Sequence, residues 1–227
     1  MAKKARKTNW FAIWISVGIL IAVGLLAWLV VAMNNQAGAP GEQPVAANIE
    51  TETGAILVGD AENRLDTYVD FMCPICGQFE LSYGPSIETL VDDGTATLGI
   101  HPISILDRAS QGTDFSTRAA NAMYCVAVAD SEAALPFMQA MFANQPAEGT
   151  TGLTDADMLS LAELVGVTGI DSCVDDGTYT KYVGEITELT PIQPGSTGIG
   201  TPTVAVNGVA LSNSELPAPD DLASLFN

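Results

Sequence analysis

Positive charge and histidine are scarce in this sequence. It has 8 Lys and Arg residues against 27 Asp and Glu, and its single histidine is His101. Four of the basic residues precede position 10, so the rest of the chain carries 4 − 27 = −23 charges. Such a surface should repel nucleic acid and anionic lipid headgroups, which argues against functions that bind them. High net charge usually serves solubility, and we favour that interpretation over an attraction for basic client proteins.

Clustered metal ligands are lacking as well. The chain has four cysteines, of which Cys73 and Cys76 are close together while Cys125 and Cys173 are isolated. A zinc site needs about four ligands, usually in paired clusters. Because only one histidine is present to complete a set, the sequence predicts no metal site and no cofactor.

One long stretch near the N-terminus has no charge. Trp10–Met33 holds 24 residues, and at about 1.5 Å per residue a helix of that length reaches roughly 36 Å, more than the roughly 30 Å of a hydrocarbon layer. A cleaved signal peptide is the alternative, but its apolar region is usually about 7–15 residues long. Trp10, Trp14 and Trp28 suit a membrane interface. We therefore predict an uncleaved transmembrane helix.

The flanks of this stretch predict its orientation. Lys3, Lys4, Arg6 and Lys7 precede it, and positive flanks remain in the cytoplasm, so the C-terminal part is expected on the outer side of the cell membrane. Residues 34–48 follow, rich in Ala, Gly, Pro, Gln and Asn and without apolar periodicity. Such a composition predicts a flexible linker.

Beyond the linker, strand and helix patterns alternate. Arg64–Phe71 is rich in β-forming residues with an alternating pattern, and Thr95–Pro102 is similar, so both predict strands. Pro74 suits the first position of a helix that begins between them. Helical patterns dominate from Ser116, an expected N-cap, to Leu189.

The C-terminal part returns to strands. Thr203–Val206 and Val209–Leu211 flank Asn207-Gly208, a strong signal for a two-residue hairpin. Pro219–Phe226 predicts a closing helix. A helical block inserted between two halves of one small sheet explains this order of elements.

The motif Cys73-Pro74-Ile75-Cys76 stands where the first strand meets its helix. A helix N-terminus places partial positive charge beside the first sulfur and favours its thiolate. Cys73 is therefore the predicted nucleophile, and Cys76, one turn inside the helix, is the resolving thiol that clears a mixed disulfide. A permanent structural bridge is the alternative, but a strand–CxxC–helix context is typical of redox chemistry.

Cys125 and Cys173 both fall in the helical block. In an oxidising compartment an even number of cysteines suggests disulfides. We expect this pair to form a structural bridge that stabilises the block by about 2–4 kcal/mol. Two buried free thiols are the alternative.

Three polar residues are candidates for further roles at the site. Asp70, three positions before Cys73, is the better candidate to accept the proton of Cys76, and Asp66 is a weaker one. The alternative for either is a solvent-exposed aspartate at a strand end. His101 has no partner in the sequence and is expected to be a structural hydrogen-bonding residue rather than a catalytic base.

The segment Phe71–Glu80 (Phe-Met-Cys-Pro-Ile-Cys-Gly-Gln-Phe-Glu) resembles the active-site segment of the DsbA-like thioredoxin-fold proteins. Gly200–Gly208 (Gly-Thr-Pro-Thr-Val-Ala-Val-Asn-Gly) resembles that family's cis-proline loop and hairpin. Leu106–Ser110 and Ser116–Ala122 are similar to membrane-tethered actinobacterial members. A CxxC motif alone is weakly specific, but together with a Thr-Pro at this distance it is strong. The resemblance covers about Asn48–Asn227.

This resemblance implies an α/β thioredoxin fold with an inserted helical subdomain, and a cis Pro202 beside the Cys73 sulfur. The backbone of Thr201 would then pair with an extended client peptide. The best-known oxidases of the family often carry histidine where this chain has Ile75, so a less oxidising couple is expected. The predicted organisation is a basic tail at 1–9, a transmembrane helix at 10–33, a linker at 34–48, and the thioredoxin domain at 49–227 with its helical insertion at about 113–190.

The expected function is that of a membrane-anchored, extracytoplasmic thiol–disulfide oxidoreductase. It would donate disulfides to reduced secreted proteins and be reoxidised by a quinone-linked membrane partner. A reductase or isomerase, for example in cytochrome maturation, would use the same residues with the opposite electron flow, whose direction depends on partners outside the chain. A non-enzymatic binding module on a thioredoxin fold is the alternative from another class.

Overall fold

The computed structural model describes residues 10–226, apart from the side chains of residues 11–13, 16 and 32–38. The predicted basic tail at 1–9 lies outside the described residues. The chain divides into two compact units, Met1–Pro40 and Gly41–Asn227.

The described part of the first unit is a helix, α1 (Trp10–Gly38). Trp10, Trp14 and Trp28 are each about two-thirds exposed, at 67%, 67% and 68%. Judged on the residues that the structure describes, no helix has an apolar stretch long enough to cross a membrane. The transmembrane span at 10–33 therefore stays a prediction.

The segment 34–48, predicted to be a flexible linker, is structured at both ends. Its first residues continue α1 to Gly38. In the second unit Gly41 and Pro44 are buried, and the Gly41 N–H donates to Glu185 Oε1 at 2.9 Å. A Cβ on Gly41 would collide with the backbone of Tyr182. The small residue Gly41 permits close packing here, and the flexible linker at 34–48 stays a prediction.

The second unit is built on a six-stranded mixed sheet in the order β1-β2-β4-β3-β5-β6. At its centre β3 and β4 are parallel, and β3 pairs with β5 in antiparallel fashion. The strands are β1 (Ile49–Glu50), β2 (Ala55–Val58), β3 (Arg64–Val69), β4 (Thr97–Pro102), β5 (Thr203–Val206) and β6 (Val209–Ala210). Helix α2 (Pro74–Asp92) connects β3 to β4.

The register assigns the side chains of β3 to two faces of the sheet. Leu65 lies opposite Leu98, and Tyr68 opposite His101. Because successive side chains point to opposite faces, the apolar residues of β3 share one face while Asp66 and Tyr68 lie on the other. The strand therefore carries part of the core on one side and a polar cluster on the other.

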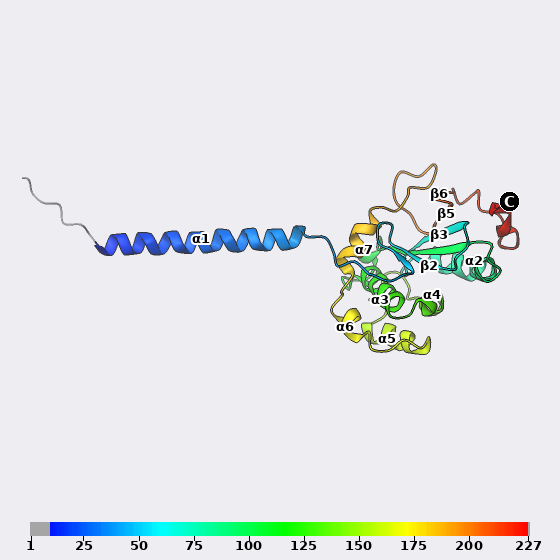
Figure 1. Ribbon diagram of the computed structural model, residues 1–227, viewed down its shortest axis with the longest axis horizontal. Helices are drawn as coiled ribbons and strands as arrows, with labels where there is room; N and C mark the ends of the chain where they lie inside the picture. The colour runs from blue at the N-terminus through cyan, green and yellow to red at the C-terminus, as the bar shows by residue number, and fades with distance from the viewer. Residues whose placement is uncertain (1–9, 227) are drawn as a thin grey trace, which may run out of the picture. The chain divides into compact units, whose positions relative to one another are not determined.

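Between β4 and β5 the chain forms a helical insertion, as predicted. Figure 1 shows α3 to α6 gathered on one side of the strands. Helix α3 packs against the other four α-helices of the insertion. These helices are α3 (Phe115–Ala129), α4 (Ala134–Ala143), α5 (Asp155–Leu164), α6 (Asp171–Asp175) and α7 (Thr180–Thr187), with short 3-10 turns η1 (Asp107–Ala109) and η2 (Ser131–Ala133).

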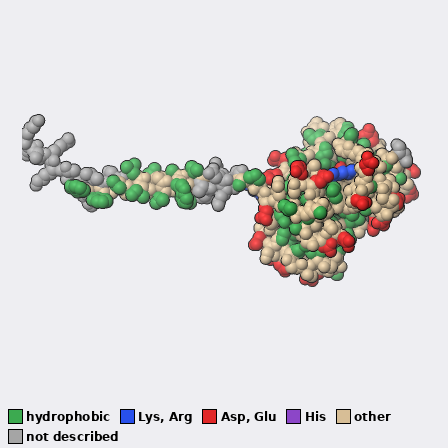
Figure 2. Space-filling model, in the orientation of Figure 1, with side chains coloured by type: hydrophobic (Ala, Val, Ile, Leu, Met, Phe, Trp, Pro, Cys, Tyr) green, Lys and Arg blue, Asp and Glu red, His purple; other side chains and the backbone are tan. Residues whose placement is uncertain are grey.

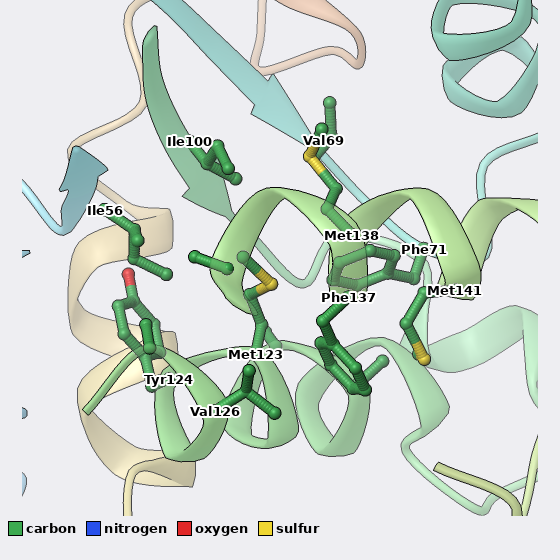
Figure 3. Packing of buried hydrophobic residues seen from close by; sticks show 14 of the residues in the cluster. Ile56, Val69, Phe71, Ile100, Met123, Tyr124, Val126, Phe137, Met138 and Met141 are labelled. Carbon is green, nitrogen blue, oxygen red and sulfur yellow. The ribbon is translucent and has the colours of Figure 1, made fainter. Parts of the chain in front are cut away.

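The sheet and the insertion share one hydrophobic core. Figure 3 shows the strand residues Ile56 and Ile100 on the side of Met123 and Tyr124 of α3, and Val69 beside Met138 of α4. All six are 3% exposed or less, so burial of the insertion and burial of the sheet are coupled. The outer surface of the second unit is acidic, with few basic side chains on the face that Figure 2 shows.

Several local predictions are confirmed and others are wrong. The predicted hairpin around Asn207-Gly208 is present. Thr154 and Asp157 form a capping box at the start of α5. Ser116, however, is not an N-cap: α3 begins at Phe115 and Ser116 is fully buried inside it. The closing segment Pro219–Phe226 is a 3-10 helix, η3. The short strands β1 and β2 were not predicted.

Candidate active site

Cys73 lies where the chain leaves β3 and enters α2. It is the N-cap of that helix, with φ −75° and ψ 114°, and Pro74 follows in the first turn. Proline has no N–H and a φ suited to this position, so the local sequence favours a helix that starts here. The first turn of α2 contains no acidic residue. The positive end of the helix dipole is therefore left to the Cys73 sulfur.

The predicted nucleophile and resolving residue are both free thiols. Cys73 is 7% exposed, whereas Cys76 is 0% exposed. The Cys73 thiol donates to the carbonyl oxygen of Thr201 across 3.6 Å. An incoming sulfur can therefore reach Cys73 from solvent but not Cys76.

The two thiols differ in acidity. The hydrogen bond from the Cys76 thiol is the main cause that lowers the pKa of Cys73 from 9.0 to about 6, and burial opposes it. Hydrogen bonds from the Thr201 side chain and from the backbone N–H groups of Cys76 and Ile75 lower this pKa further. Burial is the main cause that raises the pKa of Cys76 above its ordinary value, and the neighbouring Cys73 sulfur raises it further. At pH 7 the pair consists of a thiolate at Cys73 and a neutral thiol at Cys76.

The predicted cis-proline loop lies beside this pair. The Thr201–Pro202 peptide bond is cis. Gln193 Nε2 donates to the Pro202 carbonyl at 2.7 Å and to Thr203 Oγ1 at 2.9 Å. These bonds fix the loop with the Thr201 carbonyl facing the Cys73 sulfur. The structure thus brings together two segments that are far apart in the sequence.

The second cysteine pair forms a disulfide between α3 and α6. Cys125 and Cys173 have their Cα atoms 5.9 Å apart, as the sequence predicted for a structural bridge. Cys125 is 2% exposed, and Asn121 Nδ2 donates to the Cys173 carbonyl at 3.2 Å. The bridge therefore lies within the packed insertion. In the part of the chain that is described, no group of three or more His, Cys, Asp or Glu side chains is placed to hold a metal ion.

Comparison with known proteins agrees with this arrangement. A family model described as "Thioredoxin" matches residues 51–224. The chain belongs to the thioredoxin family. Its candidate site consists of a dithiol at the start of a helix, beside a cis-proline.

Solved structures narrow the type of thioredoxin protein. Oxidised DsbA from Mycobacterium tuberculosis is 30% identical with a TM-score of 0.62, covering 76% of this chain and 100% of that one. Reduced DsbG from the same organism, a disulfide-bond oxidoreductase, is 31% identical with a TM-score of 0.62, covering 84% of this chain and 89% of that one. The MdbA thiol–disulfide oxidoreductase of Actinomyces oris, 24% identical with a TM-score of 0.64 over 82% of this chain and 90% of that one, shows the fold alone. These likenesses show a thiol–disulfide oxidoreductase of the DsbA type.

A curated relative matches only in part. The serine/threonine-protein kinase PknE of Mycobacterium tuberculosis is 34% identical over 140 residues, which are 58% of this chain and 25% of PknE. This chain therefore spans about a quarter of that relative's length. We infer no kinase activity from the match.

Asp70, the predicted proton acceptor, is fully buried at the end of β3 in this thioredoxin domain. Its carboxylate accepts four hydrogen bonds, from the backbone N–H groups of Met72, Ile105 and Leu106 and from the Ser116 hydroxyl, at 2.7–3.0 Å. Burial raises its pKa, and these hydrogen bonds oppose the rise. The group that contacts the Cys76 sulfur is the Asp70 backbone N–H. The carboxylate thus connects the active-site segment to the segment after β4 and to α3 through hydrogen bonds. Its role as a proton acceptor stays a prediction.

The weaker candidate Asp66 and the lone His101 form one buried cluster on the other face of the sheet. His101 Nε2 lies 2.8 Å from Asp66 Oδ1, and His101 Nδ1 lies 3.2 Å from the Thr53 carbonyl oxygen. Arg64 Nε donates to the same Asp66 oxygen at 2.7 Å, and the Tyr68 ring stacks on His101 at 3.9 Å. Every polar atom of the imidazole is engaged in structural contacts, as expected for a structural histidine.

Two residues near the dithiol were given no role by the sequence. Gln145, in the segment after α4, donates from Nε2 to the backbone carbonyls of Phe71 and Cys73. Glu80, on α2, has no described hydrogen-bond partner, and burial, together with the charge of Glu88, raises its pKa to about 7. Gln145 belongs to no motif and is separated from its partners by more than 70 positions. Glu80 ends the segment that resembles the family's active site, but nothing in the sequence indicates that it is buried.

Proposed function

We propose that this chain is an extracytoplasmic thiol–disulfide oxidoreductase that donates the Cys73–Cys76 disulfide to reduced secreted proteins. The observation that carries the proposal is the contrast between a Cys73 thiolate with a pKa of about 6 and a neutral, inaccessible Cys76. A stabilised thiolate is a good leaving group and stabilises the reduced form of the couple. Both effects favour transfer of the disulfide to a client.

The exchange proceeds in two steps. A client thiolate attacks Cys73 Sγ of the oxidised pair, the Cys73–Cys76 bond breaks, and Cys76 takes up a proton. A second client thiolate then attacks the client sulfur of the mixed disulfide and releases Cys73 as a thiolate. The client loses two electrons and two protons and gains a disulfide, and the dithiol is left reduced. A quinone-linked membrane partner would then reoxidise it.

Client binding is supported by the groove next to the dithiol. It is lined by Ile75, Phe79, Tyr83, Pro202 and Leu216, among others, so it is largely apolar. Reduced, unfolded proteins expose apolar side chains that such a groove can bury. The backbone of Thr201 would pair with the extended client in the manner of an added strand.

The couple should be less oxidising than the strongest members of the family. Ile75 is 59% exposed and offers the thiolate its backbone N–H but no side-chain charge or hydrogen bond. We expect a reduction potential below the roughly −120 mV of DsbA. A value as high as that would contradict the proposal on this point.

We propose further that residues 10–33 anchor the domain in the cell membrane with the N-terminus in the cytoplasm. The support is the uncharged stretch and the basic residues before it. Alkaline extraction of membranes should leave the full chain in the pellet, and protease added outside the cell should digest the domain. A chain that is extracted, or protected from protease, would contradict this topology.

The direction of electron flow is tested by trapping thiols in living cells. Rapid acid quenching and alkylation should find Cys73 and Cys76 mostly oxidised in a disulfide donor. A mostly reduced pair would instead support a reductase or isomerase. The binding-module alternative fails if the purified domain oxidises a reduced model peptide and Cys73→Ser abolishes that activity.

A further inference from the structure

Gln145 connects the helical insertion to the active-site loop through two hydrogen bonds. Its Nε2 donates to the Phe71 carbonyl at 3.1 Å and to the Cys73 carbonyl at 2.8 Å. An amide nitrogen carries two N–H groups, so both are used on the chain that leads into the dithiol.

The position of this side chain is defined from several sides. A Cβ on Gly77 would collide with Gln145 Oε1, so the glycine in the first turn of α2 leaves room for the amide. The Gln145 backbone N–H donates to the Phe142 carbonyl at 3.2 Å, and the Phe142 ring packs against Phe71 at 5.0 Å. The amide therefore has a fixed position between the insertion and the N-terminus of α2.

The Cys73 carbonyl is the first acceptor of α2 as well as the acceptor for Gln145. The backbone N–H groups of Cys76 and Gly77 donate to it at 3.0 and 3.2 Å. Fixing this carbonyl fixes the N-cap residue, and with it the direction of the Cys73 side chain. The contacts of that sulfur with Cys76 and Thr201 depend on its position to within a few tenths of an ångström.

We propose that Gln145 is a positioning residue of the dithiol, whose amide holds the Cys73 backbone where the sulfur keeps its hydrogen bonds with Cys76 and Thr201. The inference rests on the proposed function, because it is the Cys73 thiolate that leaves during disulfide transfer. It also gives the helical insertion a role in the chemistry of the site. The insertion supplies the donor that sets the reactivity of the nucleophile.

The test compares Gln145→Met with Gln139→Met. Methionine keeps the length of the side chain and removes both N–H donors. Gln139 and Gln145 line the same pocket, next to Pro74 and Gly77. No hydrogen bond of the Gln139 side chain is described, so Gln139 is a matched control. The measurement is the pH dependence of iodoacetamide alkylation of Cys73 in the reduced chain, with the modified residue mapped by mass spectrometry.

We expect Gln145→Met to move the alkylation midpoint upward by about half a pH unit, which lowers the reaction rate at pH 5 about threefold. Gln139→Met should follow the parent profile. A purely structural role would lower the melting temperature and leave the midpoint unchanged, and that result would overturn the proposal. Gln145→Glu, which keeps the shape and removes the donors, provides a second variant if Gln145→Met does not fold. A midpoint for Gln145→Glu equal to the parent's would also overturn it.

The failure of this inference can be distinguished from failure of the proposed function. Alkylation reports the ionisation of Cys73 whether or not the chain oxidises clients. A parent chain that oxidises no reduced peptide contradicts the proposed function. If the parent chain is active and the Gln145 variants keep the parent's alkylation midpoint, only the positioning role is contradicted.

Discussion

The two cysteine pairs of this chain differ in their surroundings and in their oxidation state, because Cys73 and Cys76 are free thiols while Cys125 and Cys173 form a disulfide. Cys73 is the N-cap of α2 and Cys76 lies in its first turn, and both sulfurs form hydrogen bonds with each other and with Thr201. Cys125 and Cys173 are 48 positions apart and join two helices inside the insertion. In the first pair a helix N-terminus and local donors stabilise one thiolate, whereas in the second pair Cys125 is buried and Cys173 is half-buried. The comparison teaches that the acidity of a thiol, rather than its exposure to solvent, separates the reactive pair from the structural one.

The largest expected effect comes from removing the reactive sulfur. Cys73→Ser should abolish oxidation of a reduced model peptide, with a loss of more than about a hundredfold, because no other accessible thiol has a lowered pKa. The paired substitution Cys125→Ala with Cys173→Ala should keep the activity within about twofold at a temperature where it is folded. Equal losses in the two variants would remove the distinction between the pairs.

Removing the structural bridge should instead reduce stability. For a closed loop of this length, the chain-entropy relation gives about 4 kcal/mol of lost stabilisation for the Cys125→Ala and Cys173→Ala double variant. Urea denaturation of the parent and the variant measures the difference. A change below about 1 kcal/mol would mean that the insertion is held together by packing alone.

The acidity of the reactive pair predicts a pH dependence. With a Cys73 pKa of about 6, the thiolate fraction falls about tenfold between pH 7 and pH 5. Alkylation of Cys73 should follow that curve and be nearly constant above pH 8. A midpoint near the ordinary value of 9.0 would show that the hydrogen bonds around Cys73 do not stabilise its thiolate.

The smallest expected effect comes from replacing Glu80, which lies on α2, the helix that begins at the reactive pair. Its pKa is raised to about 7, mainly by burial, so the folded state disfavours the ionised carboxylate. The resulting loss of stability develops as the pH rises from the unfolded value through about 7, and it is absent at low pH. Glu80→Gln should therefore raise the free energy of unfolding by about 1–2 kcal/mol at pH 8 and hardly change it at pH 4. An equal gain at both pH values would contradict the assignment.

Much of the fold could be predicted because its signals are local. The alternating pattern of β3, proline at the start of α2 and the Asn207-Gly208 hairpin each depend on a few neighbouring residues. The strands β1 and β2 are too short for a pattern to form. The close packing of Gly41 could not be predicted, because composition does not distinguish a flexible glycine from one that permits close packing.

The site was predictable where chemistry lies in a motif, and unpredictable where it depends on distant contacts. Cys73 and Cys76 are three positions apart in the sequence, and the Thr201–Pro202 loop resembles a known pattern. The sequence predicts Ser116 as a helix cap, yet its hydroxyl donates to the buried carboxylate of Asp70, 46 positions away. Such a contact exists only once the sheet and the insertion have packed together, and no local rule encodes it.

The most direct test of the account is to trap the exchange intermediate in a Cys76→Ser variant. A client peptide whose cysteine has first been converted to a mixed disulfide with a small reagent reacts with the Cys73 thiolate and releases the reagent. Without the resolving thiol, the peptide should then remain joined to the chain as a mixed disulfide. We predict that peptide mapping finds this bond at Cys73 in nearly all trapped molecules and leaves the Cys125–Cys173 bridge intact. A trapped bond at Cys125 or Cys173, or no trapped species at all, would contradict the assignment of Cys73 as the reactive sulfur.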